Sequence, residues 1–213
     1  MNAATLRRQG KRLVVWLVAL AIVAAAVGLV YFGSPLQAIP GSVEAVEDDP
    51  GVTLDRTDGA IVLGPADGES DVGLVFYPGG RVHPEAYAAS LAPLAREANA
   101  TVVIPEMPLN LAVLDQGAAD RVMDRYDPDR WVVGGHSLGG VMACRFAASN
   151  PDRVAGVVLF ASYCDRDISE KGLAVLSVTG EADTVLDRSD YHANRDNRPD
   201  GARVVAGPGV NHT

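Results

Sequence analysis

The sequence contains few cysteines, and outside its N-terminal segment it has few basic residues relative to acidic ones. Only two of its 213 residues are cysteine, Cys144 and Cys164, and their spacing does not match that of metal ligands. They could pair if the domain is exported, but Cys144 lies in the alanine-rich stretch after "GHSLGG" and Cys164 follows the next apolar run, so we expect two buried, unpaired thiols. Residues 34–213 carry 14 basic and 27 acidic side chains. This excess of negative charge argues against nucleic acid as a partner.

Acidic residues are absent from residues 1–33, and no charged residue of either sign occurs from Leu13 to Phe32. At about 1.5 Å per helical residue, this apolar run is long enough to cross a hydrocarbon layer of roughly 30 Å. The sequence therefore predicts a transmembrane anchor over residues 13–33, after a basic segment at residues 1–12. The positive-inside rule places that segment in the cytoplasm and the rest of the chain outside the cell membrane.

A cleaved signal peptide is the alternative interpretation of the apolar run. Small residues precede a possible cut after Ala38, although the run exceeds the usual apolar core of a signal, about 7–15 residues. In both cases the domain is exported, either anchored by one helix or secreted. Residues 34–41, "SPLQAIPG", contain two prolines and are predicted to be a short linker to one domain over residues 42–213.

The domain has the pattern of an α/β fold. The short runs "SVEAV", "VTLD" and "AIVLG" are separated by turn residues and predict antiparallel strands. After residue 72, continuous apolar runs alternate with helical stretches, which predicts a mostly parallel sheet with helices on both faces. The expected strands are 72–77, 101–105, 130–135, 154–160, 172–178 and "ARVVAG", and the expected helices are 84–99, 112–126 and 138–150.

One serine lies between glycines where a strand is expected to become a helix, in "VVGGHSLGGVMA". The G-x-S-x-G pattern has a steric reason, because Gly135 and Gly139 remove Cβ atoms that would collide at a sharp bend around Ser137. A phosphate-binding loop would end in G-K-[ST], and a dinucleotide fingerprint would follow the first parallel strand. Neither feature is present, so the pattern favours Ser137 as a nucleophile.

A serine nucleophile needs a base, which an acid must orient, and this architecture orders them as serine, acid and histidine along the chain. His212, in the loop "AGPGVNHT" after the last strand, is the favoured base, with His192 as the alternative. Asp183, in "TGEADTV", is the favoured acid, with Glu181 as the alternative.

Backbone N–H groups are expected to stabilise the oxyanion. Leu138 directly follows the nucleophile and supplies one of them. The loop "YPGGRV" supplies the other, where we favour the amide of Gly80 over that of Arg81. We expect His136 to pack and form hydrogen bonds under the bend, and His83 to lie near this loop.

These segments give the chain a resemblance to the α/β-hydrolase superfamily, in particular to compact membrane-anchored bacterial and archaeal proteins related to dienelactone hydrolases. The similarity is carried by "FYPGGRVHPEAYA", "IPEMPLNLAVL", "WVVGGHSLGG", "VVLFASYCD", "TGEAD" and "GVNH". The resemblance implies Ser137, Asp183 and His212 as the catalytic residues of an ester hydrolase that uses no metal or organic cofactor. Relatives of this kind continue past the catalytic histidine into a final helix, which residues 42–213 do not include.

The function expected from the sequence is an exported serine hydrolase whose substrate is a small-molecule acyl compound. Only one helix and two strands are expected between Ser137 and Asp183, so no lid domain fits there, and a small, accessible ester is the favoured substrate. A membrane-tethered scaffold that keeps the fold without the reaction is the alternative. Perhydrolase chemistry at the same three residues is a third possibility.

Overall fold

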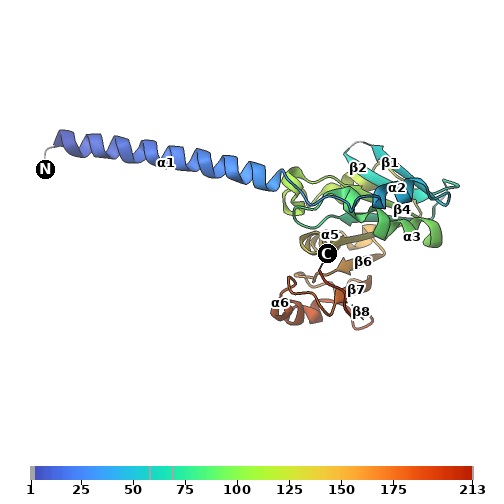
Figure 1. Cartoon of the computed structure of the whole chain (residues 1–213). Helices are drawn as coiled ribbons and strands as arrows, with labels where there is room; N and C mark the ends of the chain where they lie inside the picture. Colours follow the sequence, from blue (N-terminus) through green and yellow to red (C-terminus); the bar gives the residue numbers. More distant parts are fainter. Residues whose placement is uncertain (1–2, 58, 69, 213) are drawn as a thin grey trace.

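In the computed structural model, residues 3–57, 59–68 and 70–212 are described. Residues 1–2 of the predicted basic segment and residue 213 of the predicted domain therefore lie outside the described residues. The described residues form an eight-stranded sheet in the order β1-β2-β4-β3-β5-β6-β7-β8 (Figure 1). The β1–β2 and β2–β4 pairs are antiparallel, and all other pairs are parallel. The strands are β1 Val52–Thr57, β2 Ala60–Pro65, β3 Val72–Tyr77, β4 Ala100–Pro105, β5 Arg130–His136, β6 Gly156–Phe160, β7 Ala174–Gly180 and β8 Arg203–Gly207.

Helices cover both faces of this sheet, as the apolar runs predicted. Helices α2 (Ser42–Glu47) and α3 (Ala88–Ala98) contribute to one apolar core, and α4 (Ala118–Met123) and α5 (Leu138–Ser149) contribute to the other. The helices do not cover the whole sheet, because Val204 and Val205 of β8 are exposed. An open groove of about 370 Å³ is lined mainly by β5, β6 and β7. The remaining helical elements are α6 Arg188–Ala193 and the 3₁₀ turns Pro84–Tyr87, Pro108–Asn110, Ala112–Leu114, Pro151–Arg153 and Arg195–Asn197.

Two expected elements differ from the structure. The run "SVEAV" was expected to be a strand, but it forms α2, which buries Val43 and Val46 and packs against α3. The helix expected over 112–126 is shorter and begins at Ala118. Ala112–Leu114 form a 3₁₀ turn instead, and Asp115 after it has φ of −147° and ψ of 62°, outside the α-helical region.

Helix α1 (Ala3–Phe32) projects away from the domain (Figure 1). Its segment Gln9–Phe32 is apolar and long enough to cross a membrane, and none of its most apolar stretch is buried within the structure. The helix begins at Ala3, so the basic segment predicted at residues 1–12 is largely continuous with the apolar helix. This length and composition are compatible with an anchor and with a signal sequence.

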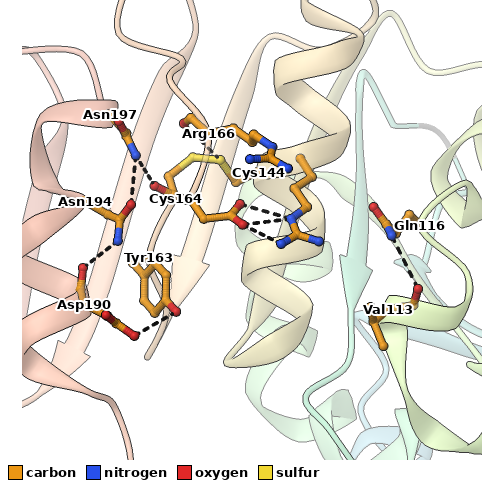
Figure 2. A network of polar contacts seen from close by, with 11 residues as sticks. Val113, Gln116, Cys144, Tyr163, Cys164, Arg166, Asp190, Asn194 and Asn197 are labelled. Atoms are coloured by element: carbon orange, nitrogen blue, oxygen red, sulfur yellow. Dashed lines mark hydrogen bonds and ion pairs between the residues drawn. A yellow bond between two sulfur atoms is a disulfide. The ribbon is translucent and has the colours of Figure 1, made fainter.

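The expectation of two unpaired thiols is wrong. Cys144 on α5 and Cys164 in the loop after β6 form a disulfide, with their Cα atoms 5.4 Å apart (Figure 2). Both residues are fully buried. An ion pair between their neighbours Arg145 and Asp165, 2.6 Å between Nη2 and Oδ2, joins the same two segments. A disulfide of this kind persists in oxidising compartments, which agrees with an exported domain.

Removing the disulfide should weaken the fold. We expect the double variant Cys144→Ser/Cys164→Ser to lose about 2–4 kcal/mol of unfolding free energy, because the open chain gains conformational entropy when it unfolds. Urea denaturation with and without dithiothreitol measures this loss. The reductant should destabilise the wild type and leave the double variant unchanged. Equal stability of the two proteins under oxidising conditions would contradict this prediction.

Candidate active site

Ser137 occupies the sharp bend between β5 and α5. Its backbone has φ of 52° and ψ of −121°, a strained conformation for a residue other than glycine. A Cβ at Gly139 would lie 2.6 Å from the carbonyl carbon of Tyr77, so only glycine allows α5 to pass this close to β3. The hydroxyl of Ser162 donates a 2.7 Å hydrogen bond to the Ser137 carbonyl oxygen. This contact holds the bend from the carboxyl end of β6.

Asp183 and His212 meet at the carboxyl ends of β7 and β8. The Nδ1–H of His212 donates a 2.8 Å hydrogen bond to Oδ2 of Asp183. The other carboxylate oxygen, Oδ1, accepts hydrogen bonds of 2.9 Å from the amides of Val185 and Leu186. With Nδ1 protonated, Nε2 of the neutral His212 imidazole can accept a proton.

The Asp183 side chain is fully buried, yet its environment keeps it ionised. Burial raises the pKa of this carboxyl, but the hydrogen bonds from Leu186, His212 and Val185 outweigh burial and hold the pKa below its ordinary value. A negative charge at this point stabilises the imidazolium that would form when His212 takes a proton.

A chain of three hydrogen bonds connects the His212 backbone to the loop after β3. Nε2–H of His136 donates to the carbonyl oxygen of His212 at 2.8 Å, which leaves Nδ1 of the neutral His136 ring as an acceptor. The Tyr87 hydroxyl donates to this Nδ1 at 3.0 Å and accepts the Gly79 N–H at 2.8 Å. His212 is therefore fixed beside the residue that precedes Ser137, and the two histidine rings lie 4.8 Å apart.

The two amides predicted to stabilise an oxyanion lie on neighbouring segments. A Cβ at Gly80 would be 3.7 Å from Cδ2 of Leu138, so the loop after β3 reaches the start of α5. The backbone amides on either side of Gly80 already have acceptors. The Gly79 N–H donates to the Tyr87 hydroxyl, and the Arg81 N–H donates to the Asn110 carbonyl oxygen at 2.8 Å. Within the described contacts, the N–H groups of Gly80 and Leu138 have no acceptor.

Neither alternative for the acid or the base takes part in the contact between Asp183 and His212. Glu181 and His192 are exposed, and His192 is on α6. His83 accepts a 3.3 Å hydrogen bond from the Glu85 amide through Nδ1, as the cap of a 3₁₀ turn. The described residues contain no group of three histidine, cysteine or acidic side chains that could hold a metal ion.

The structure thus joins Asp183 to His212 and brings His212 beside the serine bend. Their catalytic roles, and those of Gly80 and Leu138, stay predictions. Sequence reasoning missed Tyr87 and Ser162, because their contacts with His136 and Ser137 join residues that are far apart in the sequence.

Comparison with known proteins identifies the fold and the family. Residues 73–213 match the family model described as "Alpha/beta hydrolase family". Among solved structures, a predicted CIB-like hydrolase from Thermoplasma acidophilum is 18% identical, with a TM-score of 0.59 over 76% of this chain and 90% of that chain. Est1E from Butyrivibrio proteoclasticus is 14% identical, with the same TM-score and coverage. No curated protein matches this chain in sequence.

The buried His136 should make stability depend on pH. Burial lowers the pKa of this imidazole below 6.5, and the hydrogen bond to the His212 carbonyl opposes that effect only in part. The unfolded chain therefore binds more protons than the folded chain just below that pH, so the unfolding free energy falls as the pH falls. The lowered pKa of Asp183 affects the unfolding free energy in a separate pH range, below pH 3.8.

We expect this loss of unfolding free energy between about pH 7.5 and pH 5.5 to be smaller in His136→Gln than in the wild type. Urea denaturation at both pH values measures it. The exposed His192→Gln serves as the matched control and should behave like the wild type. The same pH dependence in all three proteins would contradict the prediction.

Proposed function

Because the chain belongs to the α/β-hydrolase family, we propose that it is a serine hydrolase that cleaves an ester or a related acyl compound. The observation that carries the proposal is the 2.8 Å hydrogen bond between His212 and the ionised Asp183, beside the bend that presents Ser137. A base that is oriented by a buried carboxylate, next to a strained serine, is the arrangement that activates a hydroxyl for attack.

The proposed reaction follows from these positions. The Ser137 hydroxyl oxygen attacks the acyl carbonyl carbon while His212 takes the hydroxyl proton. The amides of Gly80 and Leu138 stabilise the negative oxygen of the tetrahedral intermediate, at the N-terminus of α5, where the helix dipole favours negative charge. His212 then protonates the leaving alcohol, which departs as the acyl-enzyme forms. Water attacks the acyl-enzyme with His212 as the base, and the acid product leaves with the serine restored.

We further propose that α1 anchors this domain on the outer side of the cell membrane. Arg7, Lys11 and the neighbouring basic residues precede the apolar segment, and no acidic residue accompanies them. The buried disulfide between Cys144 and Cys164 supports an oxidising location for the domain.

A fluorophosphonate probe and a nitrophenyl ester test the catalytic proposal. We expect the probe to label the wild type and not Ser137→Ala. We also expect Asp183→Asn and His212→Gln to lower kcat/KM by about 10³-fold or more, because either change removes an oriented base. Intact-protein mass spectrometry and initial rates measure these effects.

Glu181→Gln and His192→Gln are the matched controls, and both should keep nearly wild-type rates. If Ser137→Ala hydrolyses the ester as fast as the wild type does, the proposal is contradicted. A folded wild type that neither reacts with the probe nor cleaves esters would instead favour the scaffold function.

Protease treatment of intact bacterial spheroplasts tests the anchor. With an N-terminal tag on the chain, we expect external protease to remove the domain while the tag stays protected inside the cell. Protection of the domain would overturn the proposed orientation. Release of a soluble domain that lacks the tag would identify α1 as a cleaved signal.

A further inference from the structure

The end of α1 is joined to the candidate active site by side chains from two catalytic-domain loops. The guanidinium of Arg81 donates to the carbonyl oxygens of Tyr31 at 2.9 Å and Ser34 at 3.2 Å, and it lies 3.6 Å from the centre of the Tyr31 ring. The amide of Asn110 donates to the Phe32 carbonyl oxygen at 2.7 Å. The last carbonyls of a helix otherwise lack partners, and a cation at this end also complements the helix dipole.

The linker strengthens the same junction. The Leu36 N–H donates to the Arg81 carbonyl oxygen at 2.7 Å, and the His83 N–H donates to the Leu36 carbonyl oxygen at 2.9 Å. Residues 34–41 thus begin as an extra strand-like segment paired with the loop after β3, not as a free tether. Arg81 directly follows Gly80, so the proposed oxyanion loop lies where the apolar helix ends.

The segments that meet at this junction carry exposed apolar side chains. In Figure 1 the C-terminal end of α1 meets the yellow-green segment after β4, in agreement with the contact between α1 and Pro108–Asn110. Five large apolar side chains in these segments are exposed, and we call them the apolar rim: Leu36, Ile39, Leu109, Val113 and Leu114. Leu109 is exposed although its φ of 51° is unfavourable for leucine, so neither packing nor backbone preference explains this residue.

Charge sets the apolar rim apart from the rest of the domain. Residues 33–43 and 107–114 contain no charged side chain, although acidic residues greatly outnumber basic ones in the domain as a whole. An acidic surface would be repelled by anionic lipid headgroups, whereas an uncharged apolar surface can enter the interface. Tyr31, at the end of α1, is the type of residue that lies at the level of the headgroups.

We propose that the apolar rim rests on the bilayer that α1 spans, so that the active site opens toward the membrane surface and takes amphiphilic esters whose acyl chains remain in the lipid. This inference rests on the proposed hydrolase function and on the proposed anchor. It replaces the small ester favoured by the sequence, because a site that opens onto lipid needs no lid to shelter a long chain.

Fluorescence quenching tests the membrane contact without reference to activity. Cys144 and Cys164 are paired, so a thiol-reactive fluorophore labels only the new cysteine in Leu114→Cys or in the control Val204→Cys. These two sites are equally exposed, at 54% and 53%. With the full chain in phosphatidylcholine vesicles that carry nitroxide lipids, we expect several-fold stronger quenching at residue 114 than at residue 204. Equal quenching would overturn the membrane contact and leave a protein partner as the occupant of the apolar rim.

Two nitrophenyl esters test the substrate class, one a water-soluble acetate and the other a long-chain ester dissolved in the vesicles. For Leu109→Asn/Leu114→Gln we expect hydrolysis of the vesicle-borne ester to fall about tenfold relative to that of the acetate, since each change removes apolar burial in the interface. Asparagine tolerates the left-handed backbone at residue 109, so this change should not disturb the fold. Val204→Thr is the control and should leave the ratio of the two rates unchanged.

The possible failures are distinguishable. A wild type that cleaves the acetate but not the vesicle-borne ester overturns the substrate class and leaves the hydrolase proposal intact. A wild type that cleaves neither ester overturns the hydrolase proposal and the substrate class together, while the quenching measurement still decides the membrane contact.

Discussion

The arrangement of the site depends on the close approach of two backbones at the serine bend. Strand β5 ends at His136, and α5 begins at Leu138, so the whole change of direction falls on Ser137. This geometry is possible because Gly135 and Gly139 carry no Cβ: a Cβ at Gly135 would lie 2.6 Å from the Gly139 carbonyl oxygen. The strain is held by the packed core on both faces of the sheet and by the Ser162 hydrogen bond.

The parallel sheet brings the other parts of the site to the same edge. Strands β3, β5, β7 and β8 run in one direction, so the loops that follow them gather at their carboxyl ends. Hydrogen bonds then fix the loops relative to one another, from Gly79 through Tyr87 and His136 to the backbone of His212. On its outer side, the loop after β3 also receives the end of α1 through Arg81. One short loop is thus connected both to the backbone of His212 and to the apolar helix.

The sequence predicted the features that depend on local pattern. Continuous apolar runs identified the parallel strands, and the glycines around Ser137 identified the bend. Features that depend on distant contacts were missed. The disulfide of Cys144 and Cys164 pairs a helix with a loop beyond the next strand, and only the fold brings these segments together. "SVEAV" is too short for its period to distinguish helix from strand, and packing against α3 decides the outcome.

The most direct test of the catalytic account is a crystal structure of the protein after reaction with a fluorophosphonate. We predict a phosphonyl group on Oγ of Ser137, with its oxygen about 3 Å from the amide nitrogens of Gly80 and Leu138. The imidazole of His212 should still be bonded to Asp183 and should face the adduct. A phosphonyl oxygen directed away from both amides, or an imidazole turned from Ser137, would contradict the account.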